Sequence, residues 1–253
     1  MIYVLDDTSK VSKLFEGCND TLITSCLQKV MGKIFVTDLE APVSAFAFVG
    51  CFGFLYGEPD RELVENKPDG FVVLVPQDER WAALIEEVFS DATRVSRYAI
   101  RKDTHFDVSL LREYLQLLPE GYELKPIDGD LYDQCMQFPE MMDFVSSFSD
   151  KEHFLRDGRG VVILKDGVIV SGASSYSRYR EGIEIEVSTT KDERRKHLAL
   201  VACSALILRC LEEGLYPSWD AHNMNSVRLA EKLGYVFDHE YTAYEVARTG
   251  RKH

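Results

Sequence analysis

Residues 183 to 211 read IEIEVSTTKDERRKHLALVACSALILRCL, and three kinds of structure follow one another within them. The stretch from Ile183 to Thr189 alternates apolar residues with glutamate or serine, which is typical of a half-buried β-strand with one polar face. The run from Leu198 to Leu211 is apolar on nearly every side, which indicates a helix buried within its domain. The residues between them include three successive cations, at positions 194 to 196. The sequence therefore predicts a strand that leads through a basic loop into a buried helix.

The junction of this strand and helix is suited to bind an anion. The first backbone N–H groups of a helix have no partner within the helix, and the helix dipole is positive at that end, so phosphate groups bind there. Arg194, Arg195 and Lys196 oppose the dipole and cost stability, which a bound pyrophosphate would offset. The alternative interpretation is a basic first turn that is only exposed to water.

The elements around this junction predict an α/β domain with a mixed sheet that begins after Gly121. Asp166-Gly167 is a type I′ hairpin signal, because glycine accepts positive φ at no steric cost. Gly214 is expected to end the long helix as its C′ residue. The other expected elements are strands 122–126, 161–164, 168–172, 216–221 and 236–246, and helices 131–137, 140–155 and 226–233.

The preceding residues predict a separate α/β domain, so that the domains are residues 1–120 and 121–253, divided at the turn Pro119-Glu120-Gly121. We find no phosphate-binding glycine loop, nucleophile motif or metal spacing in the first domain. Its interpretation stays open between a degenerate copy of the C-terminal fold and a part that encloses substrate or forms a homodimer. The expected elements are strands 34–37, 43–49, 51–56, 71–75 and 94–101, and helices 22–30, 78–88 and 108–118.

The composition argues against several kinds of partner. A net charge of −13 disfavours nucleic acid, because phosphate binding needs clustered lysine and arginine. The same charge suits a cationic small substrate, or it only keeps the protein in solution. The six cysteines form no Cys-x-x-Cys pair and no zinc-like spacing, so we expect neither a metal site nor a disulfide.

The uncharged run from Ala41 to Gly57 is too short for a membrane span, which needs roughly 18 residues or more. Prolines and glycines punctuate it as in a hairpin, so it predicts two buried strands and no membrane partner. Met1 to Asp7 lacks the basic region of a signal peptide. With the free cysteines, this leads us to expect a reducing, cytoplasmic location.

From Tyr122 to Val246 the chain resembles the GNAT superfamily of N-acyltransferases, through its element order and two motifs. The segment Arg194-Arg195-Lys196-His197-Leu198-Ala199 is similar to that superfamily's Arg/Gln-x-x-Gly-x-Gly/Ala motif, whose backbone amides hold the pyrophosphate of coenzyme A. The resemblance implies acetyl-CoA contacts from this segment and from Thr189. His197 stands where the central glycine is expected. We expect it to lie in the first helical turn without positive φ, with its ring pointing outwards.

The second motif lies between Trp219 and Val236 and resembles the superfamily's strand-Asn-x-x-Ala/Ser-x-x-Leu-Tyr-x-Lys-x-Gly-Phe signature. It implies that Asn223 and Ser226 contact the pantetheine and nearby CoA groups, although both residues are also good helix caps. Ala230 replaces a tyrosine that often protonates the departing thiolate. Residues 215–221 and 233–237 also resemble the sub-family of the zwittermicin A resistance protein, which by analogy implies an aminopolyol antibiotic as acceptor.

The resemblance also implies where catalysis takes place. In GNAT-like folds the strands that begin here at Ile183 and Tyr216 splay apart, the thioester lies in the gap, and a backbone amide polarises its carbonyl. A general base should lie near that gap, and the candidates are Glu186 first, then Glu184, Asp220 and His222. Asp220 could equally bind a substrate ammonium. Period-2 spacing puts both glutamates on one strand face, which a plain solvated face would also show.

Two functions of different classes follow from these residues. The first is an acetyl-CoA-dependent N-acetyltransferase, without metal, that acts on a primary amine of a small molecule. The second is a catalytically degenerate CoA-binding regulatory module, favoured by His197 and Ala230. A domain that binds a nucleotide other than CoA is a third possibility.

Overall fold

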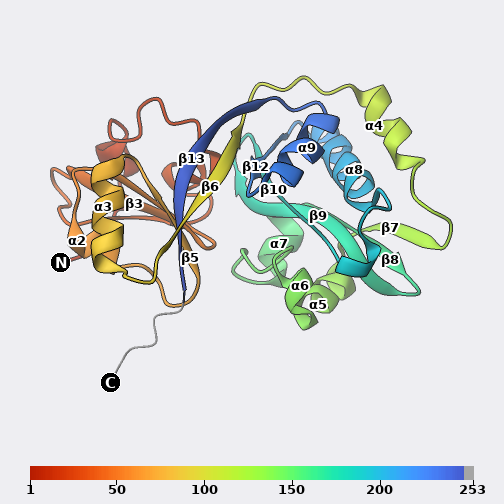
Figure 1. The fold of residues 1–253 in the computed structure, drawn as a ribbon, viewed down its shortest axis with the longest axis horizontal. Coiled ribbons are helices and arrows are strands. Elements are labelled where there is room, and N and C mark those ends of the chain that lie inside the picture. Colours follow the sequence, from red (N-terminus) through yellow and green to blue (C-terminus); the bar gives the residue numbers. More distant parts are fainter. Residues whose placement is uncertain (248–253) are drawn as a thin grey trace. The chain divides into compact units, whose positions relative to one another are not determined.

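The computed structural model describes residues 1 to 247, which divide into two compact units (Figure 1). Unit 1 comprises Met1–Arg97 and the chain from Glu240 onward, and unit 2 comprises Tyr98–His239. The divisions fall inside β6 (Thr93–Ile100) and β13 (Phe237–Val246), so the turn at Gly121 lies within unit 2. The assignment of residues 1–120 and 121–253 to separate functional domains stays a prediction.

Unit 1 is built on a mixed sheet in the order β1-β2-β3-β4-β5-β13-β6, with parallel pairing between β4 and β5. Its core lies between this sheet and the helices and contains fully buried Phe46, Leu74, Trp81 and Tyr244. The uncharged run 41–57 forms β3 and β4, as predicted. The strands are β1 (Tyr3–Val4), β2 (Lys33–Val36), β3 (Ser44–Val49), β4 (Phe52–Gly57) and β5 (Val72–Pro76); the helices are η1 (Thr8–Val11), α1 (Thr21–Leu27), α2 (Arg61–Glu65) and α3 (Glu79–Val88).

Unit 2 contains a second mixed sheet, in the order β11-β10-β9-β8-β7. Neighbouring strands are antiparallel except β10 and β11, which are parallel and are joined through α8. The strands are β7 (Tyr122–Pro126), β8 (Gly160–Lys165), β9 (Val168–Tyr179), β10 (Gly182–Thr189), β11 (Tyr216–Ser218) and β12 (Asp220–Ala221); the helices are α4 (Val108–Leu115), α5 (Gly129–Gln137), α6 (Pro139–Met142), α7 (Lys151–Asp157), η2 (Lys191–Glu193), α8 (Leu198–Glu212) and α9 (Met224–Lys232).

Helix α8 is the centre of the unit 2 core, as its apolar sequence predicts. It packs against β8, β9, β10 and β11 and against α4. Val201, Leu206 and Ile207 are fully buried, and Ile183 and Ile185 of β10 belong to the same cluster. Gly214 follows the helix with a φ of 71°, which confirms its expected place as the C′ residue.

Local sequence signals in unit 2 predict its hairpin correctly but one of its helices wrongly. Asp166 and Gly167 have φ values of 52° and 79°, and this positive pair confirms the type I′ hairpin. The single helix expected over residues 140–155 is wrong, because α6 ends at Met142 and α7 begins only at Lys151. The break lies in residues 143–150, at the end of which the Asp150 carboxylate accepts a hydrogen bond from the His153 N–H at 2.8 Å and so starts a new helix.

The strands β10 and β11 part after three paired positions, the last of which joins Glu184 to Ser218. Beyond Trp219 the chain forms β12, and Asp220 then pairs with Ala99 of β6 instead of with β10. The single strand expected over residues 216–221 is therefore two strands with different partners. This change of partner confirms the expected splay.

The two halves of the chain repeat one order of elements. Apart from the short η2 and β12, the C-terminal half runs β8-β9-β10-α8-β11-α9-β13, and the N-terminal half runs β2-β3-β4-α2-β5-α3-β6. In both, three antiparallel strands are followed by a helix and by a strand parallel to the third. This order is the one expected if the N-terminal half is a degenerate copy of the C-terminal fold.

Across residues 1 to 247, every helix is too short or too polar to cross a membrane.

Candidate functional site

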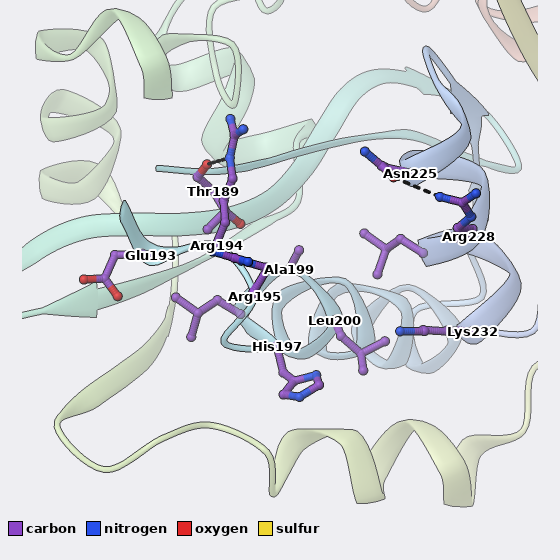
Figure 2. Close-up of a pocket in the computed structure, with 12 residues that line it drawn as sticks. Thr189, Glu193, Arg194, Arg195, His197, Ala199, Leu200, Asn225, Arg228 and Lys232 are labelled. Carbon is purple, nitrogen blue, oxygen red and sulfur yellow. Dashed lines mark hydrogen bonds between the residues drawn. The ribbon is translucent and has the colours of Figure 1, made fainter. Parts of the chain in front are cut away.

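A cavity of about 470 Å³ lies in unit 2, between the loop that joins β10 to α8 and one face of α9 (Figure 2). The loop and the first turn of α8 form one wall, and α9 forms the other. The lining residues are Thr189, Glu193, Arg194, Arg195, His197, Leu198, Ala199, Leu200, Asn225, Arg228, Leu229 and Lys232. Six residues predicted from sequence to bind the cofactor are among them: Thr189, Arg194, Arg195, His197, Leu198 and Ala199.

The loop has an unusual backbone at two positions. Arg195 and His197 both have a φ of 64°, in the left-handed region. The expectation that His197 needs no positive φ is wrong, because it is the N-cap residue of α8 and not part of its first turn. For a residue other than glycine this conformation costs roughly 1–2 kcal/mol, and such strain gathers at functional sites. The ring of His197 does point outwards: it is exposed, and Figure 2 shows it directed away from Thr189 and Arg194.

The start of α8 has no side-chain cap. The side chain of its N-cap residue, His197, accepts no hydrogen bond from the N–H groups of the first turn. By contrast, the other helices of eight or more residues in the described chain begin with such a cap, supplied by Asp78, Asp107, Asp128 and Asn223. An aspartate before α8 would repel a phosphate, whereas the uncapped N–H groups can bind one.

Cations surround the cavity although the chain as a whole carries a charge of −13. Arg194, Arg195, Arg228 and Lys232 line it, and within residues 1–247 none of these four makes an ion pair with a carboxylate. Arg194 Nε donates to the Thr189 carbonyl at 3.3 Å, and Arg228 Nη1 donates to Asn225 Oδ1 at 3.2 Å (Figure 2). The local charge therefore favours a polyanionic ligand.

Glu193 is the acidic residue of the lining, and basic partners hold it. Its carboxylate accepts hydrogen bonds from Lys196 Nζ at 2.6 Å, from Lys165 Nζ at 2.9 Å and from the Tyr122 hydroxyl. The bonds from Lys196, Tyr122 and Lys165 lower the pKa of Glu193 to about 2. The structure thus engages Lys196, which was predicted to bind the cofactor, with Glu193 and not with the cavity.

Asn223 and Ser226 do not line the cavity. The Asn223 side chain caps α9, accepting hydrogen bonds from the N–H groups of Asn225 at 2.9 Å and Ser226 at 3.0 Å. The Ser226 hydroxyl accepts a hydrogen bond from Trp219 Nε1 at 3.1 Å. Both positions therefore have structural tasks, and their contact with CoA stays a prediction.

Helix α9 contributes residues that the sequence reasoning missed. Asn225, Arg228, Leu229 and Lys232 face the cavity at i, i+3, i+4 and i+7 spacing. This spacing marks one face of a helix and includes two cations. It was the signal that could have identified them.

The candidate bases lie on the face of β10 that turns away from α8. Ile183 and Ile185 pack in the α8 core, so Glu184 and Glu186 point to the other face. Glu184 is 5% exposed, which excludes a plain solvated face at that position, and Glu186 is half-buried. Glu184 is the last residue of β10 paired with β11, so the two glutamates flank the start of the gap, and Asp220 lies half-buried beyond it in β12.

The tyrosine that the GNAT resemblance implies as proton donor has no replacement at its own position. Ala230 is fully buried. Tyr235 is buried too, its hydroxyl donates to the Pro217 carbonyl at 2.6 Å, and burial raises its pKa well above the ordinary value. Tyr235 therefore serves packing and is poorly placed to give up a proton.

Comparisons with known proteins agree with this geometry. The profile of the family described as GNAT acetyltransferase matches residues 12–244. An uncharacterized N-acetyltransferase of Bacillus subtilis (strain 168), YdfB, is 29% identical over 198 residues, which cover 76% of this chain and 71% of that protein.

Two solved structures are informative. A GCN5-related N-acetyltransferase-like protein from Streptococcus suis 89/1591 is 45% identical, covers 95% of this chain and 98% of its own, and superposes with a TM-score of 0.90. A tandem GNAT protein from the clavulanic acid biosynthesis pathway is 11% identical, covers 100% of both chains with a TM-score of 0.55, and so supports the fold alone. The chain belongs to the GNAT acetyltransferase family.

Proposed function

We propose that unit 2 binds acetyl-CoA and transfers its acetyl group to a primary amine of a small molecule. One observation carries the proposal: the uncapped start of α8 follows a loop with positive φ at Arg195 and His197 and lies in a cavity ringed by cations. Coenzyme A offers a pyrophosphate and a further phosphate as matching anions. The N–H groups of the loop and of the first turn of α8 would hold the pyrophosphate.

Helix α9 adds the second half of this binding site. Arg228 and Lys232 project from it into the cavity and would pair with the remaining phosphate. Leu229 and Leu200 give an apolar surface between the charged groups. The pattern of charge around apolar lining suits a nucleotide with a long organic tail.

The acyl group would lie where β10 and β11 part. Beyond Glu184, β10 has no pairing with β11, so backbone amides on that edge can polarise the thioester carbonyl. We propose Glu186 as the base that takes the proton of the amine, with Glu184 as second candidate and Asp220 as a group that binds the substrate ammonium. With Ala230 in place of tyrosine, water protonates the thiolate.

An aminopolyol antibiotic is the acceptor that the sub-family resemblance suggests, and it belongs in the first substrate panel. The six cysteines are all free thiols, which supports a reducing location such as the cytoplasm. The alternative of a CoA-binding module without turnover rests on Ala230.

The test is thiol release from acetyl-CoA in the presence of a panel of amines and aminopolyols. We expect release with at least one amine, and a large loss of kcat in Glu186→Gln or Glu184→Gln with unchanged acetyl-CoA affinity. Tight binding without release for every amine would instead support the regulatory module. Stabilisation against heat by ATP or NAD but not by acetyl-CoA would refute CoA binding altogether.

Asn223 has its own test, because a cap and a ligand contact respond differently to substitution. Asn223→Asp keeps the cap but removes the amide donor and adds a charge, whereas Asn223→Ala loses both. If Asn223 touches CoA, both variants weaken acetyl-CoA binding. If only Asn223→Ala loses stability and neither changes the dissociation constant, the residue is a cap alone.

A further inference from the structure

Lys102 places an amine at the point where the strands of the catalytic gap part. It lies just after β6, within unit 2. Its Nζ donates a hydrogen bond to the Trp219 carbonyl at 2.7 Å and lies 3.9 Å from Glu184 Oε2. Trp219 separates β11 from β12, and Glu184 is the last β10 residue paired with β11.

The surroundings hold this amine in place. The side chains of Lys102 and Glu184 are 24% and 7% exposed, so the pair is largely shielded from water. Ser177 and Ser218, both buried, are the strand partners of Glu184 on either side. The Lys102 amine thus lies beside a candidate base and near the expected position of the thioester. The amine of an acceptor substrate would need the same placement.

The chain on either side of Lys102 is also fixed. The Arg101 guanidinium and the Asp103 carboxylate form an ion pair with each other. Neither side chain therefore competes for the contact between Lys102 and Glu184. The Thr104 N–H donates to the Tyr216 hydroxyl at 3.1 Å, which ties this segment to β11. Lys102 therefore sits on a segment anchored to the strand that borders the gap.

We propose that Lys102 is an internal acceptor, so that the enzyme acetylates its own Lys102 from acetyl-CoA. This inference rests on the proposed acetyl transfer. Lys102 Nζ forms a bond to the acetyl carbonyl carbon as the bond from that carbon to sulfur breaks. Of the two protons that the ammonium loses, one ends on the CoA sulfur as a thiol and the other is released to water, with Glu184 as the relay.

Acetylation would change the acceptor site without dismantling it. The acetyl-lysine amide keeps one N–H, which can still donate to the Trp219 carbonyl. The positive charge beside Glu184 is lost, so that carboxylate becomes available to an external ammonium. Modified and unmodified enzyme should then differ in KM for a cationic amine.

The experiment incubates the full chain with acetyl-CoA alone and follows intact mass and digested peptides. We expect one acetyl group, localised to Lys102, at a first-order rate that is independent of protein concentration. Lys102→Arg, which keeps the charge and donors, should lose the modification, and Glu184→Gln should slow it at least tenfold. Exposed Lys191 in the same unit is the matched control and should gain only background acetylation.

Three results would overturn the inference. The first is an unmodified Lys102 in protein that binds acetyl-CoA and releases thiol with an external amine, which leaves the proposed function intact. The second is equal acetylation of Lys102 and Lys191. The third is an undiminished rate at Lys102 in an Arg195→Glu/Arg228→Glu variant that no longer binds acetyl-CoA, because the reaction would then be uncatalysed. If acetyl-CoA neither binds nor releases thiol with any amine, the proposed function fails as well.

Discussion

His197 shows how one side chain can occupy the place of a glycine and keep the glycine's backbone conformation. The family motif has glycine at this position, and here histidine has a φ of 64°. Its ring is exposed and is directed away from Thr189 and Arg194 (Figure 2). The conformation, and not the absence of a side chain, is what the binding loop requires here.

His197→Gly should relieve this strain and raise the free energy of unfolding by up to about 1 kcal/mol, after the greater entropy of unfolded glycine is subtracted. Acetyl-CoA affinity should be unchanged or higher. Urea unfolding and titration calorimetry measure the two quantities. Thr190→Gly is the control, because Thr190 has a φ of −55° and glycine there should only destabilise. A comparable loss of stability in both variants would contradict the account.

Glu193 gives a pH-dependent contribution whose sign follows from its partners. Lys196, Tyr122 and Lys165 depress its pKa in the folded chain to about 2, below the unfolded value of about 4.3. Its stabilisation is therefore complete above the unfolded pKa and is lost as the pH falls through the folded one.

We expect Glu193→Gln to lower the urea midpoint by a constant amount between pH 7 and pH 5, and by less as the pH falls towards 3. Denaturation curves at each pH measure this difference, with exposed Asp192→Asn as the control. A difference between wild type and Glu193→Gln that grows on acidification would have the wrong sign for this ion-paired carboxylate.

At the scale of elements, α8 and α9 contribute different groups to the proposed acetyl-CoA site. The start of α8 supplies N–H groups, and one face of α9 supplies Arg228 and Lys232. Arg228→Ala should raise the dissociation constant for acetyl-CoA about tenfold, the effect of losing one hydrogen bond to a charged group. Calorimetry at two salt concentrations should show the difference shrinking at the higher one.

Glu231→Ala is the matched control for this prediction, because Glu231 is exposed on α9 but does not line the cavity. It should leave the dissociation constant unchanged or slightly lower it by removing a negative charge. Equal weakening by both variants would mean that α9 acts through its stability and not through contact.

The sequence predicted those elements whose signals are local and strong. The alternation in β10, the apolar run of α8 and the Asp166-Gly167 turn each depend on neighbouring residues alone. The short helices α2 and α6 were not predicted as separate helices, since four or five residues show little periodicity. The division of strand 216–221 depends on which partner strands are available, and that is a property of the assembled sheet.

The parts of the site that lie in one continuous segment were predictable from sequence, whereas contacts between residues far apart in the chain were not. The motif from Arg194 to Ala199 located the loop, yet the positive φ of His197 and the pairing of Lys196 with Glu193 arise from packing. Lys102 was missed because it is more than eighty residues away from Glu184 in sequence and follows no motif.

At the scale of the whole molecule, the two halves of the chain share an order of elements, but within residues 1–247 the features of a donor site occur in unit 2 alone. In unit 1, α2 begins with Asp60, whose carboxylate accepts hydrogen bonds from the Glu62 N–H at 2.9 Å and from Thr37 Oγ1 at 2.7 Å. Carboxylates at Asp60 and Glu62 would repel a phosphate. Strands β4 and β5 stay paired from Phe52 to Leu55. They therefore lack the early separation that is seen between β10 and β11.

The chain should therefore bind one acetyl-CoA, in unit 2. Titration calorimetry with acetyl-CoA on the wild type and on Arg195→Glu/Arg228→Glu tests this most directly. We predict a stoichiometry of one per chain for the wild type and loss of measurable binding in the double variant, with its thermal unfolding unchanged. Two sites per chain, or undiminished binding by the folded double variant, would contradict the central claim that the α8 cavity holds the acyl donor.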